Sequence, residues 1–254
     1  MRIVALLVAL LSVAGTGLAA CAPLPASHPS NLAHVGNARQ MLVAVGNSRT
    51  SSYATLYAYE KNADGSWRDV FGAMPARVGY NGWHWAAQRV QNDGSSPAGT
   101  FSMTTAFGLS ANPGTRLAYR HSDGDDYWSG DPRDPRTYNL YQTSVSPRRT
   151  WRLTDATTER VASYPTQYAY AAVINAYRPP DASITYNAAR GQYETSQPTA
   201  TGHGFSIFLH INGRGSTAGC VSVDQANMLR ILRWVDPAKA PRITMAPSEW
   251  LATA

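Results

Sequence analysis

One stretch of the chain, residues 205–236, constrains the fold most, because it reads as a strand, a glycine-rich loop, a cysteine and a helix. Alternating apolar residues predict the strand; they are Phe205, Ile207, Leu209 and Ile211. His210 lies on the opposite face, at the end of this strand. Residues 212–219 are small and turn-forming, which predicts a loop that ends at Cys220.

A helix is expected soon after the cysteine. Ser222 and Gln225 have the spacing of a capping box, which marks a helix start. The apolar stripe of one helix face follows, at Met228, Ile231, Leu232 and Val235. Asp236 and Pro237 then end the helix. Cys220 is therefore predicted to lie just before a helix N-terminus.

This arrangement suggests nucleophilic catalysis. A helix N-terminus lowers the pKa of a nearby thiol, and a histidine on the neighbouring strand can accept its proton. We expect Cys220 to be the nucleophile and His210 the base, with His203 as a weaker candidate base. Gly219 lets the chain approach closely, and the N–H groups of Gly219 and Cys220 are candidate oxyanion donors. Alternatively, Cys220 taken alone would be a small buried apolar residue, and His210 taken alone would be a histidine that forms only structural hydrogen bonds.

The same residues resemble the catalytic signature of the L,D-transpeptidase (YkuD-type) family, which has a histidine, a variable loop and Ser/Thr-x-Gly-Cys. His210 matches the first part, and residues 217–220 (TAGC) match the second. Upstream, residues 95–108 (SSPAGTFSMTTAFG) are similar to the Pro-x-Gly-x-Phe segment of the family. The resemblance spans residues 41–245 and is closest to a secreted actinobacterial branch.

Two positions depart from the common family form. Ala218 stands where that form has a second histidine, and Ser222 stands where it has an arginine. The resemblance therefore leaves His210 as the only base of the motif. Binding of the substrate carboxylate would fall to Arg214 or Arg230.

The resemblance implies a mainly β fold, a β-sandwich or mixed sheets with one main helix after the catalytic cysteine. It implies that Cys220 attacks a peptidoglycan stem peptide, forms a thioester and passes the acyl group to an amine, giving a 3–3 crosslink. It also implies acylation by carbapenems and no cofactor. We expect substrate contacts from six residues: Asn212, Arg214, Ser216, Thr217, Tyr138 and Asn139. The ring of His210 needs an orienting acceptor, for which Asn212 or a loop carbonyl is suitable.

Two other functions stay open. With water as the acceptor, the same nucleophile would make an L,D-carboxypeptidase or another thiol hydrolase of wall peptides. The departures at Ala218 and Ser222 would also suit a non-catalytic, wall-binding lipoprotein.

The N-terminal segment predicts export. Arg2 and the apolar run 3–13 are typical of a signal peptide, since the run is too short to span a bilayer. Residues 18–21 (LAAC) resemble a bacterial lipobox, which predicts that residues 1–20 are removed and that Cys21 is lipidated at the outer face of the cytoplasmic membrane. Ordinary cleavage with a free Cys21 is the alternative. Lipidation would leave Cys220 without a disulfide partner, since the chain has 2 cysteines.

Residues 21–38 are rich in Pro, Ser, Ala and Asn and predict a flexible tether, with a catalytic domain at 39–254. Further strands are expected at 41–45, 53–59, 67–71, 100–107, 167–177 and 241–246, a long irregular region at 108–149, and a short helix or turn at 151–161.

The charge of the chain argues against one class of partner. The net charge is +6, but no cluster of Lys and Arg and no nucleic-acid motif is present, so no nucleic-acid partner is expected. Anionic wall polymers or a simply solvated surface fit the scattered arginines. The aspartates of residues 123–134 lack the register of a calcium loop, so no metal site is expected.

Overall fold

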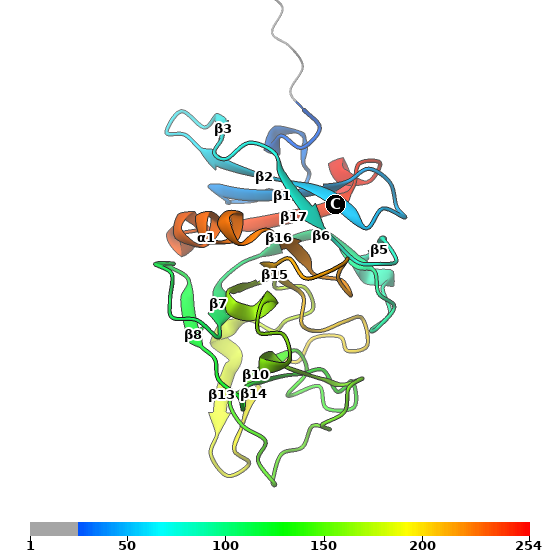
Figure 1. Cartoon of the computed structure of the whole chain (residues 1–254), viewed down its shortest axis with the longest axis vertical. Helices are drawn as coiled ribbons and strands as arrows, with labels where there is room; N and C mark the ends of the chain where they lie inside the picture. The colour runs from blue at the N-terminus through cyan, green and yellow to red at the C-terminus, as the bar shows by residue number, and fades with distance from the viewer. Residues whose placement is uncertain (1–24) are drawn as a thin grey trace, which may run out of the picture.

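A long mixed sheet forms the framework of the molecule. The structure, a computed structural model, describes residues 25–254. Twelve strands share this sheet, in the order β5-β6-β17-β1-β2-β4-β16-β15-β12-β7-β8, with β3 paired to β2 (Figure 1). Two small sheets, β10-β9-β11 and β13-β14, lie at the far end of the molecule from β1 and β2. The predicted mainly β fold with mixed sheets and one helix is confirmed.

The strands of the large sheet are short and come from the whole length of the described chain. They are β1 (Gln40–Gly46), β2 (Tyr53–Lys61), β3 (Trp67–Asp69), β4 (Met74–Arg77), β5 (Trp83–Trp85), β6 (Ser96–Ser102), β7 (Thr105–Gly108), β8 (Ala118–His121), β12 (Ala171–Val173), β15 (Phe208–Ile211), β16 (Val221–Val223) and β17 (Arg242–Pro247). The small sheets comprise β9 (Tyr127–Ser129), β10 (Leu140–Gln142), β11 (Thr158–Arg160), β13 (Ile184–Asn187) and β14 (Gln192–Thr195).

The helix α1 (Gln225–Trp234) is the only α-helix in residues 25–254. Seven 3-10 turns accompany it: η1 (Pro29–Asn31), η2 (Ala86–Gln88), η3 (Val161–Ser163), η4 (Gln167–Ala169), η5 (Asp181–Ser183), η6 (Pro237–Lys239) and η7 (Leu251–Thr253).

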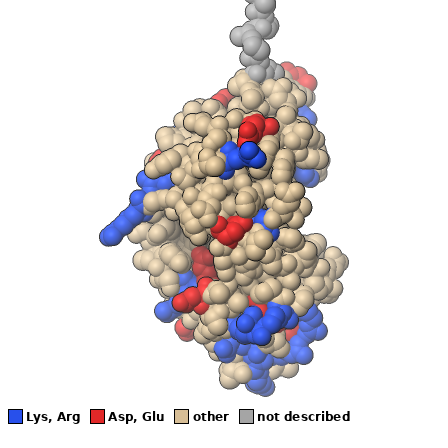
Figure 2. Space-filling view, turned by 90° about the vertical axis from the view of Figure 1, so that its right-hand side faces the viewer, with Lys and Arg blue, Asp and Glu red and all other residues tan. Residues whose placement is uncertain are grey.

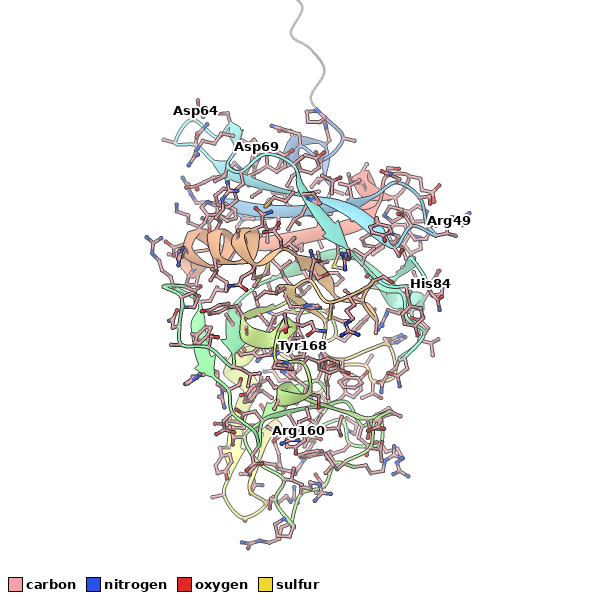
Figure 3. The ribbon with its side chains drawn as sticks, viewed as in Figure 1. Arg49, Asp64, Asp69, His84, Arg160 and Tyr168 are labelled. Carbon is pink, nitrogen blue, oxygen red and sulfur yellow. The ribbon has the colours of Figure 1, made fainter. Side chains whose placement is uncertain are left out.

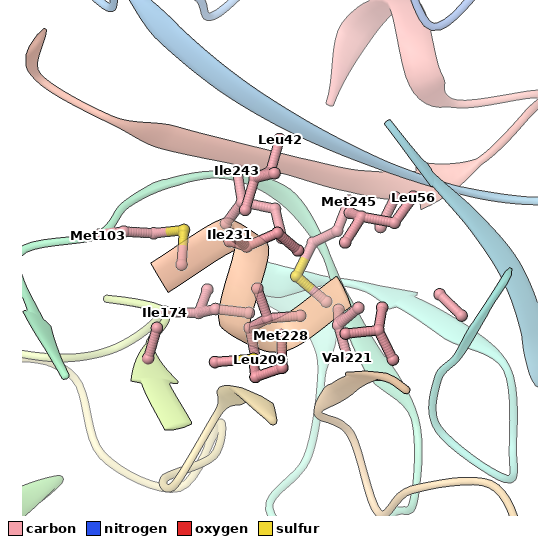
Figure 4. Close-up of a cluster of buried hydrophobic side chains, with 14 of the residues drawn as sticks. Leu42, Leu56, Met103, Ile174, Leu209, Val221, Met228, Ile231, Ile243 and Met245 are labelled. Carbon is pink, nitrogen blue, oxygen red and sulfur yellow. The ribbon is translucent and has the colours of Figure 1, made fainter. Parts of the chain in front are cut away.

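The main hydrophobic core forms between α1 and the large sheet. The predicted stripe of α1 is buried, with Met228, Ile231 and Leu232 each fully covered. Figure 4 shows Met228 and Ile231 of this helix among side chains of β1, β2 and β17, namely Leu42, Leu56 and Ile243. Burial of this apolar surface, at roughly 25 cal/mol per Å², holds the helix on the sheet.

A second, aromatic core packs on the other face of β15. Phe208 meets Phe107 edge to face at 4.9 Å between ring centroids and Trp128 at 5.0 Å. Because side chains alternate along a strand, Leu209 and Ile211 enter the main core, while Phe208 and His210 face the aromatic one. The strand β15 therefore carries the candidate base on the face turned toward the small sheets.

The helix begins later than the capping box predicts. The N-cap is Asp224, whose carboxylate accepts the N–H of Asn227 at 2.9 Å. Ser222 lies instead inside β16, where it pairs with His210 and Arg77 of the neighbouring strands. This pairing extends the strand beyond the cysteine, so the short strand β16 separates Cys220 from the helix.

Several other predicted boundaries differ. Residues 100–107 belong to two strands, β6 and β7, and the predicted strand 205–211 starts only at Phe208. Ser206 has φ of 54°, a left-handed value that ends the extended run. The region 108–149, expected to be irregular, contains β8, β9 and β10.

The described part of the expected tether is packed against the domain. Ala38 and Leu32 are buried beside Met41 and Tyr59, and the hydroxyls of Ser27 and Tyr59 lie 2.9 Å apart. The folded unit therefore begins before residue 39. The predicted signal peptide, the lipobox and Cys21 lie outside the described residues.

Candidate active site

The parallel pairing of β15 and β16 brings His210 and Cys220 to one face of the sheet. Leu209 pairs with Val221 and His210 with Ser222, so Cys220 continues the register opposite Phe208. Opposite residues point to the same face, and the ideal strand spacing and rise put such diagonal neighbours roughly 8 Å apart at Cα. The two candidate residues are both more than nine-tenths buried and both line one cleft.

His210 is held as a neutral imidazole. Its Nδ1 lies 2.8 Å from the carbonyl oxygen of Ile211, which accepts a hydrogen bond from a protonated Nδ1. The edge of the ring meets Tyr168 at 5.5 Å. Burial lowers the pKa of His210 to about 4, although the bond to Ile211 opposes this effect. With Nδ1 protonated, Nε2 is free to accept a proton.

The acceptor that orients the ring of His210 is thus the carbonyl of Ile211, at the end of β15. Asn212, the other expected acceptor, binds a different group. Its side-chain amide lies 2.8 Å from the hydroxyl of Ser222. His203, the weaker candidate base, places Nδ1 2.9 Å from the carbonyl of Arg89 and stacks on Tyr177.

Cys220 is held as a neutral thiol, which is opposite to the expected thiolate. Its Sγ donates to the carbonyl of Ser206 at 3.2 Å and accepts the N–H of Phe208 at 3.4 Å. Burial and, to a smaller extent, the charge of Glu159 raise the pKa of Cys220 to about 12, while the Phe208 N–H and Arg89 oppose the shift. The expected helix effect is absent because β16 stands between the sulfur and α1.

The cleft in front of these two residues has a volume of about 720 Å³. The glycine-rich loop after β15 forms one wall, and the segment from Leu153 to Tyr168 forms the other. Figure 3 places Tyr168 between the large sheet and the end of the molecule where Arg160 lies. A cleft of this size suits a peptide side chain or a small peptide.

Three of the six expected substrate contacts line the cleft. Arg214 and Ser216 are exposed there, and Thr217 is half-buried. Arg230, the other candidate for carboxylate binding, lies over the ring of Phe71 instead. Asn212 is outside the cleft lining.

Tyr138 and Asn139 are buried behind the cleft. The hydroxyl of Tyr138 donates to the carbonyl of Gly204 at 2.9 Å and accepts its N–H at 3.1 Å. The amide oxygen of Asn139 accepts the N–H of Ser206 at 3.1 Å. Both residues fix the segment before β15. Because the carbonyl of Ser206 in this segment accepts the thiol proton, Tyr138 and Asn139 position the site without lining the cleft.

The loop before Cys220 is fixed by Thr217 and Gly219. The Thr217 hydroxyl donates to the carbonyl of Cys220 at 2.7 Å and accepts the N–H of Gly219 at 3.1 Å. Gly219 has φ of 143°, and a Cβ there would lie 2.8 Å from the carbonyl oxygen of Ser95. A glycine is required here, and one of the two candidate oxyanion donors is engaged within the loop.

Arg89 is a structural residue of the site that the sequence did not reveal. Its guanidinium is buried and donates to three carbonyls, at Ser95, His203 and Ala218, over 2.7 to 3.3 Å. It thereby ties the loop before Cys220 to the segment before β15. No local motif marks this residue, because its acceptors are backbone carbonyls and two of them, at His203 and Ala218, lie in distant parts of the chain.

Glu159 and Tyr168 are the other functional residues that were missed. Glu159 belongs to β11, and its carboxylate accepts a hydrogen bond from the hydroxyl of Tyr168. Both residues line the cleft with Cys220 and His210. The stretch around Glu159 shows no apolar period in the sequence. Tyr168 lies in the predicted strand 167–177, of which only residues 171–173 form a strand, and Tyr168 belongs to the turn η4. Nothing local indicated a wall of the site.

Among residues 25–254, no group of three or more His, Cys, Asp or Glu side chains is arranged to bind a metal ion. No helix within the same residues has the length and apolar character needed to cross a membrane.

Comparison with known proteins supports the resemblance noted in the sequence. The family model of the L,D-transpeptidase catalytic domain (YkuD) matches residues 39–243. Searches of curated proteins and of solved structures gave no match. Since the matched region covers most of the chain and contains the whole cleft, the chain belongs to the L,D-transpeptidase catalytic domain (YkuD) family.

Proposed function

We propose that the protein transfers acyl groups of peptidoglycan stem peptides through a thioester on Cys220. The observation that carries this proposal is the placement of Cys220 and His210 on one face of adjacent strands, at the same cleft, with Nδ1 of His210 bound to a carbonyl. Membership of the family supports the substrate class. The reaction would be an L,D-transpeptidation that forms a 3–3 crosslink.

In the first half of the reaction, Sγ of Cys220 attacks the carbonyl carbon of the donor peptide and gives its proton to Nε2 of His210. The C–N bond then breaks, and the departing amine takes that proton, which leaves the thioester. In the second half, an acceptor amine attacks the thioester carbon and the C–S bond breaks. The sulfur recovers a proton through His210.

The protonation states favour a concerted proton transfer. Because the pKa of the thiol is raised to about 12 and that of the imidazole is lowered to about 4, both groups are neutral at physiological pH. The proton must therefore move from sulfur to nitrogen as the S–C bond forms, with the substrate displacing water from the cleft.

Substrate binding in this proposal uses the exposed side of the glycine-rich loop. Arg214 supplies a positive charge for a peptide carboxylate, and Ser216 and Thr217 lie beside it in the lining of the cleft. In this proposal Arg214 takes the role of the arginine that the common family form has at position 222. In this chain that position is a serine, which is buried in β16.

The test is to incubate the chain from Ala22 onward, which lacks the predicted signal peptide and Cys21, with a stem tetrapeptide, with and without an acceptor peptide, and to analyse the products by mass spectrometry. The proposal predicts a crosslinked dimer in the presence of acceptor, and loss of all product in Cys220→Ala and His210→Ala. A tripeptide alone, even at high acceptor concentration, would instead assign the protein as a carboxypeptidase. No turnover of any stem peptide by the folded protein would favour a non-catalytic wall-binding role.

We also infer that the protein is exported and anchored by a lipid on Cys21, facing the cell wall. The lipobox-like sequence LAAC at residues 18–21 supports this inference. Radiolabelled fatty acid should be incorporated into the full-length protein in a bacterial host and not into Cys21→Ala; equal labelling of both proteins would contradict it.

A further inference from the structure

Glu159 is an acidic side chain in the cleft without a cationic partner. Two other partly covered carboxylates at this end of the molecule are paired with arginines, Asp131 with Arg152 and Glu194 with Arg136. Within residues 25–254, Glu159 forms no ion pair and is bound only by the hydroxyl of Tyr168. An unpaired carboxylate in a desolvated site is unfavourable unless a ligand compensates its charge.

The position of Glu159 is unhelpful for the first half of the reaction. Its negative charge raises the pKa of the Cys220 thiol and that of the Tyr168 hydroxyl. Formation of the thiolate would be easier without this carboxylate. Its chemical role therefore belongs to the second half of the reaction, when the sulfur is already acylated and carries no charge.

A second unpartnered polar group lies in the same part of the cleft. The hydroxyl of Ser206 is buried and has no hydrogen-bond partner among the described residues. It lies near the carboxylate of Glu159 without a hydrogen bond of acceptable geometry. Ser206 is also held at a left-handed φ of 54° through Asn139, which fixes the hydroxyl at the lining of the cleft. Such a buried hydroxyl is satisfied when a ligand with N–H groups enters.

We propose that Glu159, Tyr168 and Ser206 form the subsite for the acyl acceptor and bind the primary ammonium group of a second stem peptide beside the thioester. This inference rests on the proposed function. Glu159 neutralises the ammonium charge and then removes one of its protons, so that the free amine can attack. Ser206 accepts a hydrogen bond from the same nitrogen.

The proton balance of this step is complete. An ammonium acceptor carries three N–H protons, and the amide product keeps one of them. The first proton passes to the carboxylate of Glu159, the lone pair of nitrogen then attacks the thioester carbon, and the C–S bond breaks. The second proton passes through Nε2 of His210 to the sulfur, and Glu159 later releases its proton to water.

The acid–base properties of Glu159 suit this role. Burial raises its pKa to about 7, against the hydrogen bond from Tyr168 and the nearby hydroxyl of Ser206, and a base is most effective when its pKa is near the working pH. A free alkyl amine has a pKa of about 10, so it arrives protonated. The titratable and charged groups around Glu159 are Asp155, Arg160, Tyr164, Tyr168, Cys220, His210 and Arg89.

The experiment compares the wild-type domain with Glu159→Gln, using Asp155→Asn as the matched control. Asp155 is an exposed acid on the same wall of the cleft. Each protein is given a stem tetrapeptide as donor, and the partition between transfer and hydrolysis is measured at increasing concentrations of a primary amine acceptor. The same series is repeated with hydroxylamine, which is uncharged at neutral pH.

The expected result is that Glu159→Gln lowers the ratio of transfer to hydrolysis at least tenfold with the primary amine. Donor acylation should be as fast as in the wild type or faster, transfer to hydroxylamine should be retained, and Asp155→Asn should behave as wild type. In Glu159→Gln, transfer should also lose the pH dependence that the wild type shows near pH 7. Tyr168→Phe, which keeps the carboxylate, provides a second variant with a smaller loss if Glu159→Gln does not fold.

Two results would overturn the inference while the proposed function stands. One is an unchanged partition ratio in Glu159→Gln, and the other is an equal loss with hydroxylamine, which would mean that charge is not what Glu159 recognises. A wild-type protein that is not acylated by any donor would refute the proposed function itself.

Discussion

Cys220 and His210 form a neutral pair of buried residues at the cleft. The thiol proton is directed at the carbonyl of Ser206 and the imidazole proton at the carbonyl of Ile211. Desolvation disfavours the charged form of each residue, which raises the pKa of the cysteine and lowers that of the histidine. The site is therefore unreactive until a substrate carbonyl enters, which protects the thiol from adventitious modification.

This state predicts slow alkylation of Cys220 at neutral pH. With the thiol pKa raised to about 12, the thiolate fraction should increase about tenfold for each pH unit between 7 and 9. The rate of reaction with iodoacetamide, followed by intact mass, should rise in the same proportion without reaching a plateau. A domain that starts at Ala22 contains no other cysteine, so the assay reports on this thiol alone, and Cys220→Ala gives the background. A rate that levels off near pH 7 would contradict the neutral pair.

At the residue scale, the sequence pointed to Cys220 and His210, which the structure brings to one cleft, but not to their surroundings. Cys220 and His210 were recognisable because strand periodicity and the loop composition are local. The direction of the thiol pKa was predicted wrongly, because it depends on burial and on Glu159, which comes from a distant part of the chain. Arg89 and Ser206 were missed for the same reason, since their roles arise from long-range backbone contacts.

At the scale of elements, the segment that runs from β15 through the loop and β16 to α1 is anchored at two points, the start of the loop and the helix N-cap. The loop is anchored by Arg77, whose guanidinium donates to the carbonyl of Gly213 at 2.8 Å, and the helix starts at Asp224. The loop can therefore present Cys220 rigidly while its outer residues stay exposed to substrate.

The helix cap gives a prediction for stability. Asp224→Ala should lower the free energy of unfolding by about 0.5–2 kcal/mol, because it removes the acceptor for the N–H of Asn227. Gln225→Ala should have little effect, since the expected capping box does not form. Urea unfolding of both variants measures the difference. An equal loss in the two variants, or none in Asp224→Ala, would contradict the observed cap.

The sequence predicted the existence and the buried face of α1 correctly but not its first residue. Ser222 and Asp224 both satisfy local rules for a helix start. The choice between them is made by the pairing of β16 with β4 and β15, which holds Ser222 and Val223 in extended conformation. Such pairing between distant segments is not visible in a local motif.

At the scale of the whole molecule, the large sheet and the small sheets enclose the cleft from two sides. Figure 2 shows arginine side chains gathered at the end opposite β1 and β2, where the small sheets lie; the lysines of the chain, Lys61 and Lys239, belong to β2 and η6. Asp131 in this region receives the guanidinium of Arg152 at 2.6 Å. This ion pair joins two segments of the chain, and neither Asp131 nor Arg152 belongs to a helix or strand.

The pair predicts acid sensitivity. The hydrogen bonds from Arg152 lower the pKa of Asp131 to about 2, below its ordinary value of 3.8. A carboxyl group whose folded pKa is depressed stabilises the fold above its unfolded pKa, and this contribution is lost as the pH falls from 3.8 toward 2. Asp131→Asn should therefore be less stable than wild type at pH 6 and show a smaller further loss on acidification to pH 3.

Thermal unfolding across this pH range measures the effect. Asp125→Asn, at an exposed site in a nearby turn, is the control and should follow the wild type. A wild-type stability that is the same at pH 6 and pH 3 would contradict the prediction.

For the whole molecule, composition and the family motifs were sufficient to predict a mainly β fold with one helix. They did not predict β8, β9 and β10 within 108–149, because strands of three or four residues carry too little pattern to be seen. The docking of residues 27–38 was missed because a segment rich in Pro and Ser lacks a periodic signal even when single residues such as Ala38 are buried.

The account depends most on Cys220 being an accessible nucleophile in a cleft that accepts acyl donors. The most direct measurement is the intact mass of the soluble domain after incubation with a carbapenem, beside Cys220→Ala and His210→Ala. The account predicts one adduct on the wild type, none on Cys220→Ala and acylation slowed at least about 100-fold on His210→Ala. A folded wild-type protein without an adduct, or an adduct that persists in Cys220→Ala, would contradict it.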